Sequence, residues 1–357
     1  MQRFLLFVLT VFLAVSCTEQ EVVQEENIRG ADAYHDNQGR DDLLSGGVKM
    51  IPITTPAGDF RVWTKRVGNN PRKKVLLLHG GPGATHAYFE AADSYFPGAG
   101  IEYYYYDQLE SGNSDHPNDP NLWTTDRFVS EVEQVRTALG LDQDNFYLLG
   151  HSWGGILAME YALAHQENLK GLIISNMMAS VPEYNKYAQE VLGPRMDPEV
   201  LREIKALEAA EDYQNPRYEE LVTNNYYTEH VLRMPPEEWP EPVLRGLGGI
   251  NYDIYLAMQG PSEFGIMQGA ILEDWDRSGD LQEITVPTLV IGGEHDTMDP
   301  EYMKWMAGEF PNGQYLYCPQ GSHMAMYDDQ KTYFGGLIRF INDVDRNNAA
   351  GGGARVQ

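Results

Sequence analysis

The residues Gly150-His151-Ser152-Trp153-Gly154 form a G-x-S-x-G motif between a strand pattern and a helix pattern. A serine on such a strand–turn–helix corner projects its hydroxyl from the turn, and glycines are needed because side chains would crowd it. The N-terminus of the following helix offers free N–H groups and a partial positive charge. The motif therefore predicts that Ser152 is a catalytic nucleophile, with a structural turn as the alternative.

A serine hydroxyl is a weak nucleophile, so it needs a base that a third group orients. On this kind of turn the chain order is serine, then aspartate or glutamate, then histidine. His323 is the only histidine after residue 295 and follows the last strand pattern, so it is the expected base. Asp296, in the loop after the preceding strand pattern, is the expected acid. Asp299 stands directly before Pro300 and is expected to cap a helix.

Acyl transfer at a serine also needs two backbone N–H donors for the oxyanion. Trp153, directly after the nucleophile, is expected to supply the first. Gly81 is expected to supply the second, from the turn His79-Gly80-Gly81-Pro82-Gly83 that follows another strand pattern. This turn lacks both G-x-G-x-x-G and a P-loop lysine, which disfavours a phosphate-binding role.

These motifs resemble the proline iminopeptidase (prolyl aminopeptidase) family of α/β-hydrolases, whose members include the tricorn-interacting aminopeptidase factor and L-amino acid amidases. The resemblance covers roughly residues 47–345 and rests on HGGPG at 79–83, GHSWGG at 150–155, GGEHD ending at Asp296 and GSHMAMYDDQ around His323. It implies a serine aminopeptidase that releases an N-terminal residue, often proline, from short peptides or amides.

An aminopeptidase must hold a free α-ammonium at a fixed distance from Ser152, and a carboxylate does this through charge-assisted hydrogen bonds. The family carries such a glutamate in a G-P-x-E-F segment of its cap. The matching residues here are Gly260-Pro261-Ser262-Glu263-Phe264, so the resemblance implies that Glu263 binds the substrate. The alternative is a solvated surface glutamate.

Two positions depart from the family pattern. Many relatives have a glutamate directly after the triad aspartate as a second amine anchor, where this chain has Thr297. Relatives also have glycine in a D-Q-x-G-x-G-x-S segment at the position of Glu110. We therefore hypothesise that Glu110 is a second substrate-binding residue that supplies the missing carboxylate.

Strand and helix patterns alternate along most of the chain, which predicts an α/β-hydrolase fold with a mainly parallel central sheet and helices on both faces. The expected strands lie at 48–53, 60–67, 75–78, 101–106, 146–149, 172–175, 288–291 and 314–317, and the expected main helices at 124–139, 154–164, 300–309 and 329–342. Residues 181–262 lose the strand patterns. We expect them to form a helical cap inserted into a core of residues 46–180 and 263–346, with Trp239, Tyr252, Tyr255 and Trp275 lining an apolar pocket or packing within the cap.

Residues 1–16 contain one basic residue, Arg3, and an apolar run that is too short to span a bilayer but is typical of a signal peptide. The run ends in Leu13-Ala14-Val15-Ser16-Cys17, which resembles a bacterial lipobox. We therefore expect lipid attachment at Cys17 and an exported lipoprotein anchored to a membrane of the cell envelope, with a secreted or periplasmic protein as the alternative. Residues 17–45 are expected to be an acidic tether and residues 347–357 a flexible tail.

The composition limits the possible partners. The 357 residues include 26 Lys+Arg and 53 Asp+Glu, a formal net charge of −27, which disfavours nucleic-acid binding. Two cysteines exclude a disulfide framework, and no metal-ligand spacing such as H-E-x-x-H occurs, so neither a metal nor a cofactor is expected. The oligomeric state stays open. The competing functions are an amino acid amidase, an esterase or lactonase on the same triad, and a non-catalytic lipoprotein that uses the fold for binding.

Overall fold

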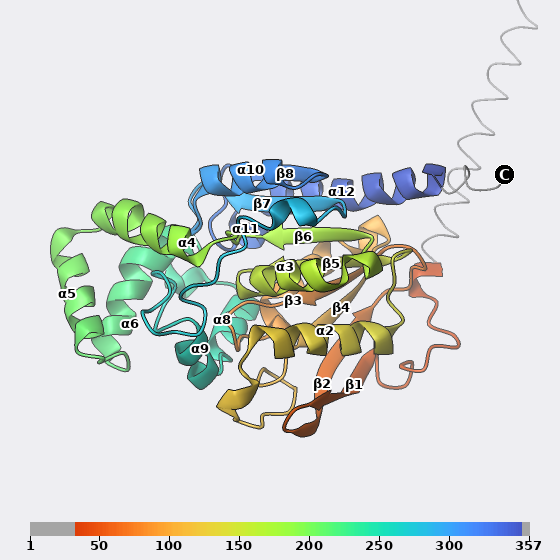
Figure 1. Ribbon diagram of the computed structural model, residues 1–357, viewed down its shortest axis with the longest axis horizontal. Helices are drawn as coiled ribbons and strands as arrows, with labels where there is room; N and C mark the ends of the chain where they lie inside the picture. The colour runs from red at the N-terminus through yellow and green to blue at the C-terminus, as the bar shows by residue number, and fades with distance from the viewer. Residues whose placement is uncertain (1–32, 352–357) are drawn as a thin grey trace, which may run out of the picture.

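An eight-stranded sheet runs through the centre of the molecule (Figure 1). The structure is a computed structural model that describes residues 33–351. The strand order is β1-β2-β4-β3-β5-β6-β7-β8, in which β1, β2 and β4 pair antiparallel and the remaining neighbours pair parallel. The strands are β1 (Val48–Thr55), β2 (Gly58–Val67), β3 (Lys74–Leu78), β4 (Glu102–Asp107), β5 (Phe146–His151), β6 (Gly171–Ser175), β7 (Thr288–Gly293) and β8 (Gly313–Cys318).

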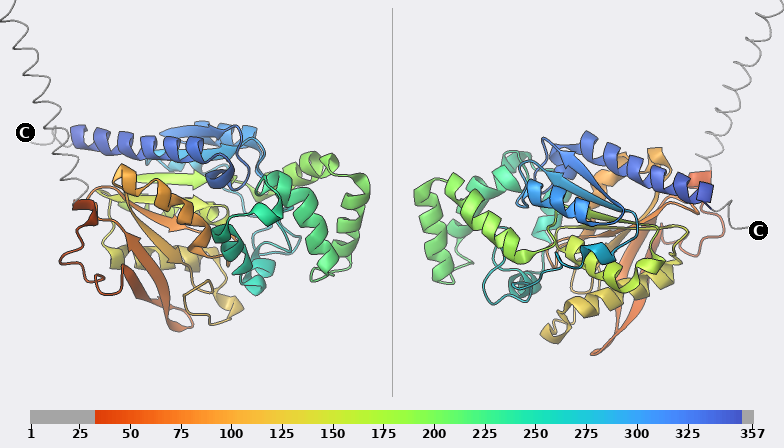
Figure 2. Two further views of the ribbon diagram at one scale, coloured as in Figure 1. Left: turned by 180° about the vertical axis from the view of Figure 1, so that it is seen from behind. Right: turned by 45° about the horizontal axis from the view of Figure 1, so that its top comes forward.

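Helices cover both faces of this sheet (Figure 2). Residues of the central strands alternate between the core clusters on the two faces. Leu76 and Leu148 belong to the core cluster that contains α2 (Thr125–Leu139), α3 (Trp153–His165) and α10 (Pro300–Glu309). Leu77 and Leu149 point the other way, to the cluster that contains η1 (His86–Ser94) and α12 (Gln330–Gly351). Because both faces are covered, the central strands are continuous runs of buried residues, as parallel strands require. The predicted α/β-hydrolase architecture is therefore confirmed.

Side-chain caps explain where the main helices begin and end. The Thr124 hydroxyl accepts a hydrogen bond from the backbone N–H of Arg127 at the start of α2, and Gly140 ends that helix with φ 64°. The Asp299 carboxylate accepts from the N–H of Glu301 at 3.0 Å, so this residue caps α10 as the sequence predicts. The remaining short elements of the core are η2 (Pro97–Ala99), η3 (Pro120–Leu122), η4 (Gln166–Asn168), η9 (Leu281–Glu283) and α11 (Ala325–Asp328).

The segment of residues 181–262, called the cap segment below, follows β6 and contains helices but no strand, and the structure describes all of it. Its helices gather at one end of the sheet, drawn in green and teal in Figures 1 and 2. They are α4 (Val181–Tyr187), η5 (Ala188–Leu192), η6 (Gly193–Arg195), α5 (Pro198–Ala209), α6 (Pro216–Val222), η7 (Thr223–Tyr227), α7 (Thr228–His230), η8 (Pro236–Glu238), α8 (Glu241–Gly248) and α9 (Tyr252–Met258).

The structure corrects part of the predicted tether. Tyr34 is 4% exposed, packs against Gly68 and donates a hydrogen bond of 2.9 Å to the carbonyl of Ile101. Asp42 is equally buried and forms an ion pair of 2.6 Å with Arg66 on β2. Residues 33–45 are therefore part of the domain. The predicted signal peptide, Cys17 and the rest of the tether lie outside the described residues.

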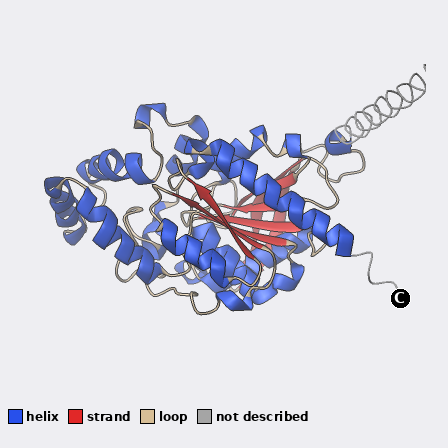
Figure 3. Cartoon of the chain, turned by 90° about the horizontal axis from the view of Figure 1, so that it is seen from above, coloured by secondary structure: helices blue, strands red, loops and turns tan. Residues whose placement is uncertain are grey.

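The C-terminal end needs a similar correction. Helix α12 continues through residues 347–351, where the sequence predicts a flexible tail, because an apolar stripe along this helix packs onto the sheet. Figure 3 shows this long helix crossing above the strands and ending near the C-terminus. Within residues 33–351, no helix combines the length and the apolar character that a membrane crossing requires.

Candidate active site

The residues that the sequence singles out gather where the parallel strands end at their carboxyl ends. Ser152 follows β5 at the centre of the sheet, Asp296 follows β7, and His323 follows β8 at the edge. In open α/β sheets this edge is the usual place for ligands, because loops from neighbouring strands meet there. The order of the strands thus brings together side chains that are far apart in the chain.

Ser152 occupies a strained turn between β5 and α3. Its φ is 56° and its ψ is −129°, a conformation that non-glycine residues rarely adopt. The turn needs its glycines because a Cβ on Gly154 would lie 2.1 Å from the carbonyl oxygen of Leu78. A Cβ on Gly80, in the turn after β3, would lie 2.8 Å from the Cβ of Ser152. Close backbone approach on two sides therefore holds the serine at the end of the sheet.

His323 and Asp296 form a buried hydrogen-bonded pair. The distance from Nδ1 of His323 to Oδ1 of Asp296 is 2.9 Å, and Asp296 has no exposed surface. Since Nδ1–H donates to the carboxylate, Nε2 is the acceptor nitrogen of the neutral ring. Nε2 is buried and has no hydrogen-bond partner among the described residues, so it is free to accept a proton.

His151, the residue before Ser152, contacts the loop that carries His323. Nε2 of His151 donates to the carbonyl of His323 at 2.8 Å, and the two imidazole rings lie 4.9 Å apart. Burial, together with the nearby His323, lowers the pKa of His151 to about 3, so this ring stays neutral. No hydrogen bond joins the Ser152 hydroxyl to His323 in the described structure, and catalytic hydrogen bonds often tighten only when substrate binds.

The electrostatics suit His323 for proton transfer. Burial disfavours its charged form, but the charge of Asp296, their hydrogen bond and the charge of Glu263 together raise the pKa of His323 above its ordinary value. The raised pKa means that the imidazolium that forms during serine attack is stabilised. Glu263 therefore contributes to the raised pKa of His323 even though it belongs to another part of the chain.

Two further side chains hold the Asp296 carboxylate, and the sequence analysis assigned neither of them to that task. Asn176, directly after β6, donates from Nδ2 to Oδ2 of Asp296 at 2.6 Å and to the carbonyl of Ser322 at 3.1 Å. The Thr297 hydroxyl lies 3.3 Å from Oδ1 of Asp296 and 3.1 Å from Nδ1 of His323. The only sequence signal for Asn176 was its place after a buried strand.

The expected oxyanion donors are Gly81 and Trp153. The N–H of Trp153 is at the start of α3, and neither it nor the N–H of Gly81 donates a hydrogen bond to another described residue. The neighbouring N–H of Gly80 is already used, since it donates to the Tyr88 hydroxyl at 2.6 Å. The Tyr88 hydroxyl also lies 3.1 Å from Nδ1 of His151, so it connects the turn after β3 with the turn after β5. The N–H groups of both expected donors are therefore unused by the described residues.

Glu263 lies among tyrosines. The hydroxyl of Tyr255 donates to its Oε1 at 2.7 Å, and the hydroxyls of Tyr184 and Tyr227 bond its carbonyl and N–H at 2.6 and 3.2 Å. Its charge contributes to raising the pKa of each of these tyrosines, after burial. None of the ion pairs among residues 33–351 includes Glu263. The half-buried carboxylate therefore has hydrogen-bond donors but no cation.

Glu110 sits apart from this group. Its side chain is fully buried, and Oε1 accepts a hydrogen bond of 3.4 Å from the indole of Trp123. Oε2 has no hydrogen-bond partner in the described part of the chain. The backbone of Glu110 is left-handed, with φ 74°, which explains why glycine suits this position in relatives. The carbonyl of Glu110 accepts from Asn251 of the cap segment at 3.0 Å.

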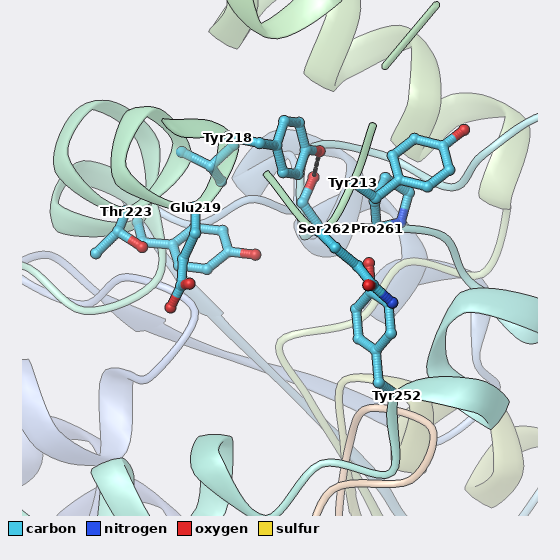
Figure 4. Close-up of a pocket in the computed structure, with 10 residues that line it drawn as sticks. Tyr213, Tyr218, Glu219, Thr223, Tyr252, Pro261 and Ser262 are labelled. Carbon is cyan, nitrogen blue, oxygen red and sulfur yellow. Dashed lines mark hydrogen bonds between the residues drawn. The ribbon is translucent and has the colours of Figure 1, made fainter. Parts of the chain in front are cut away.

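A cavity of about 340 Å³ opens in the cap segment, and Ser262, the residue before Glu263, lies in its wall (Figure 4). Tyr218, Tyr227, Tyr252 and Pro261 supply much of its wall, and Ser262 accepts a hydrogen bond of 3.0 Å from Tyr218. The other aromatic residues that the sequence suggested as pocket lining have different partners. Tyr255 bonds Glu263, the indole of Trp239 bonds the carbonyl of Met234, and that of Trp275 bonds Glu160.

The fold and the site define an α/β-hydrolase, and comparison with known proteins agrees. Residues 73–330 match the family described as alpha/beta hydrolase fold. The chain is 58% identical to the proline iminopeptidase of Flavobacterium johnsoniae over 83% of this chain and 98% of that protein. It is 55% identical to the proline iminopeptidase of Chitinophaga pinensis over 84% of this chain and 100% of that protein.

A solved structure points the same way. The proline iminopeptidase of Mycobacterium smegmatis superposes with a TM-score of 0.71 at 29% identity, over 83% of this chain and 99% of that one. The chain therefore belongs to the proline iminopeptidase family of α/β-hydrolases, which confirms the resemblance that its motifs carry, and it is an aminopeptidase-type enzyme.

Proposed function

We propose that this enzyme is a serine aminopeptidase that releases proline or another small or apolar residue from the free N-terminus of short peptides or amino acid amides. The observation that carries the proposal is Glu263, a carboxylate with no cationic partner among residues 33–351, whose charge reaches His323. A half-buried carboxylate of this kind gains most from a cationic ligand, because a charge-assisted hydrogen bond compensates its partial desolvation. A substrate α-ammonium supplies that cation.

The proposed reaction is acyl transfer through an ester on Ser152. His323 takes the Ser152 proton at Nε2 as Oγ bonds to the carbonyl carbon, and the Gly81 and Trp153 N–H groups stabilise the oxyanion. His323 then gives the proton to the leaving nitrogen as the C–N bond breaks. Asp296 keeps the His323 tautomer throughout. Water repeats the sequence on the ester and frees the amino acid.

Glu263 limits this chemistry to the first residue of a chain. If its carboxylate holds the α-ammonium, only the carbonyl one residue away can reach Ser152. An internal peptide bond has no ammonium at that distance, so we expect an exopeptidase.

The test compares prolyl and alanyl naphthylamides with free and with acetylated amines. The wild-type enzyme is expected to cleave the free-amine compounds and to leave the acetylated ones intact. Ser152→Ala is expected to lower turnover on the order of a million-fold. Retained turnover in Ser152→Ala would refute the proposal, and a preference for p-nitrophenyl esters over amides with a free amine would favour an esterase or lactonase.

We infer that the apolar part of the substrate enters the cavity beside Glu263. Ser262, directly before the carboxylate, lines this cavity, as does Tyr227, whose hydroxyl accepts from the Glu263 N–H. The ring of Tyr252 suits a proline-like ring or an apolar side chain. Tyr252→Ala is expected to raise KM more for the prolyl than for the alanyl compound. An equal change in KM for both compounds would show that the cavity does not bind the substrate.

Glu110 is proposed as a second carboxylate that favours the ammonium. The support is Oε2 of Glu110, which has no hydrogen-bond partner among the described residues. Because Oε1 is held by the Trp123 indole, we propose that Glu110 attracts the ammonium by its charge and does not contact it. An unchanged KM for aminoacyl amides in Glu110→Gln would end this part of the proposal.

We also propose that the enzyme is an exported lipoprotein whose Cys17 carries the lipid anchor. The support is the apolar run and the lipobox-like residues that end at Cys17. Labelling of growing cells with a radioactive fatty acid is expected to mark the wild-type protein. The Cys17→Ser variant is expected to lose the label and to leave the membrane fraction, and a labelled variant would contradict the proposal.

A further inference from the structure

One stretch of the cap segment, residues 227–231, contacts the loops that carry the proposed base and acid and also contacts Glu263. It starts at the end of η7, passes through α7 and ends at Val231, which is 2% exposed. His230 belongs to no sequence motif. In the structure it lies between the loop that carries Asp296 and the loop that carries His323.

The backbone of this stretch holds the loop of the base. The N–H of His323 donates to the carbonyl of His230 at 2.9 Å, and the N–H of Met324 donates to the carbonyl of Val231 at 2.9 Å. The Ser322 hydroxyl also donates to the Val231 carbonyl, at 2.8 Å, which makes three hydrogen bonds between this stretch and the loop. Three consecutive residues of the loop, Ser322 to Met324, are bonded in this way. The cap segment therefore fixes the position of the His323 backbone.

The side chain of His230 holds the loop of the acid. Its Nδ1 lies 2.9 Å from the carbonyl oxygen of His295, the residue before Asp296. A carbonyl oxygen only accepts, so Nδ1 carries the proton. Burial is the main cause that lowers the pKa of His230, so the ring is neutral and offers one donor nitrogen. The Tyr226 ring, with its centroid 5.0 Å from that of His230, packs beside the imidazole.

The same stretch also reaches the proposed amine anchor. The carbonyl of Tyr227 accepts from the N–H groups of Val231 and Leu232, each at 2.9 Å. The hydroxyl of Tyr227 accepts from the N–H of Glu263 at 3.2 Å. Tyr227 thus joins the backbone that holds the base to the residue that is proposed to hold the substrate.

We propose that His230 is a positioning residue for the reaction, because its imidazole and its carbonyl together fix the Asp296 loop against the His323 loop. One residue then sets the separation between acid and base from both sides. This inference rests on the proposed function, since it concerns how the same Ser152–His323–Asp296 set is held. It adds that the cap segment orients the triad as well as covering the site.

The test compares His230→Leu with His230→Asn. The two replacements have nearly the same shape, but Nδ2 of asparagine can donate to the His295 carbonyl from about the place of Nδ1, and leucine cannot. We expect His230→Leu to lower kcat about tenfold or more with a much smaller change in KM, and His230→Asn to restore most of the loss. Rates are normalised to the fraction of Ser152 that a fluorophosphonate labels, so that unfolded protein does not count.

The pH profile separates positioning from mere support of the fold. When the Asp296–His323 contact loosens, Asp296 raises the His323 pKa less, and the base stays neutral to lower pH. The acid limb of kcat/KM is therefore expected to move to lower pH in His230→Leu and to stay near its wild-type place in His230→Asn. A purely structural role would lower the labelled fraction and leave the acid limb where it is.

A matched control is available in the core. His165 also packs against a tyrosine, Tyr161, with ring centroids 5.2 Å apart, and contacts neither triad loop. His165→Leu is expected to keep the wild-type kcat and acid limb. Wild-type kcat in His230→Leu, or no rescue by asparagine in folded protein, overturns the inference. Absence of amide turnover in the wild-type enzyme instead overturns the proposed function, so the two failures are distinct.

Discussion

Glu263 lies close enough to His323 for its negative charge to raise the pKa of that imidazole. Glu263 belongs to the segment that follows the cap helices, whereas His323 follows the last strand, so the chain brings them together only when it folds. In the proposed reaction, this pairing links substrate binding to proton transfer. When an ammonium neutralises the Glu263 charge, the imidazolium of His323 loses part of its stabilisation. The pKa of His323 then falls, so its imidazolium gives up a proton more readily once substrate is bound.

The first prediction follows from this link. Glu263→Gln removes the charge and keeps the shape, so KM for aminoacyl naphthylamides is expected to rise at least tenfold. The His323 pKa falls in the variant because one of the charges that raise it is gone. Since the base must be neutral to act, the acid limb of kcat/KM in the free enzyme is expected to shift to lower pH.

Asp274→Asn is the matched control for Glu263→Gln. It removes the same charge from an exposed position in the same region, and it should change neither KM nor the acid limb. A Glu263→Gln variant with wild-type KM and an unmoved acid limb would show that the carboxylate does not serve the reaction.

Asn176 gives the second prediction. It donates to Asp296 at 2.6 Å and has φ 54°, a left-handed conformation that asparagine, aspartate and glycine tolerate. Asn176→Asp keeps the size and this tolerance but sets two carboxylates against each other, so one of them must take up a proton. We expect kcat to fall tenfold or more, with KM nearly unchanged.

Asn176→Gly separates the lost donor from the new repulsion. It removes the hydrogen bond without adding a charge, so its kcat should lie between those of the wild type and Asn176→Asp. Steady-state kinetics at several pH values checks both variants, and an Asn176→Asp enzyme as active as the wild type at neutral pH would show that Asp296 needs no such support.

The third prediction concerns the turn that touches the nucleophile. A Cβ on Gly80 would lie 2.8 Å from the Cβ of Ser152 and 3.3 Å from its Oγ. Gly80→Ala must therefore displace Ser152 or the turn, and we expect slower fluorophosphonate labelling and a kcat lower by about tenfold or more. Gly98→Ala, where an added Cβ meets nothing within 4 Å, should match the wild type. Equal labelling rates in the two variants would contradict this prediction.

The fourth prediction tests the packing of residues 33–45. Asp42 holds the buried guanidinium of Arg66 through contacts of 2.6 and 2.8 Å. Removing one partner of a buried ion pair costs about 3–5 kcal/mol, so Asp42→Ala should lower the free energy of unfolding by that amount. The neighbouring Asp41→Ala breaks only an exposed pair with Lys49 and should change it by less than about 1 kcal/mol. Denaturant unfolding measures both changes in free energy, and similar values for the two variants would contradict the prediction.

The same ion pair predicts a pH dependence of stability. The hydrogen bond from Arg66 lowers the pKa of Asp42 in the folded state. A carboxyl with a lowered pKa stabilises the fold at pH values above its unfolded pKa, about 4, and this contribution is lost as the pH falls through the folded pKa. The difference in unfolding free energy between wild type and Asp42→Ala should therefore shrink below about pH 4. A constant difference down to pH 2 would contradict this assignment.

Much of the fold and the core of the site could be predicted from local patterns. The strands around Leu76 and Leu148 are buried on both faces and read as apolar runs, and the glycines around Ser152 mark a turn that no other residue fits. Asp296 could be found because it follows the buried strand β7, and His323 because it follows β8 and is the only histidine after residue 295. The glutamate at position 110, where the family pattern has glycine, could also be recognised in the sequence. Its φ of 74° is a backbone conformation that favours glycine.

Contacts across long stretches of chain could not be predicted in the same way. The sequence predicted a tether where Tyr34 and Asp42 pack onto the domain. Their partners, Arg66 near the end of β2 and Gly68 directly after it, are not neighbours in the sequence, so no local pattern reveals the contacts. No sequence motif marks His230. Its role depends on two loops that approach it from different strands.

The sequence by itself determined the kind of chemistry, because a G-x-S-x-G turn, an aspartate loop and a histidine loop are each recognisable within a few residues. Only the tertiary structure decided what holds them. Strands β6, β7 and β8 lie side by side, so Asn176 meets Asp296, and the cap segment folds back so that residues 227–231 meet His323 and Glu263. Periodic patterns specify which residues are buried, but hydrogen bonds between loops depend on how the elements pack, and no local pattern encodes that.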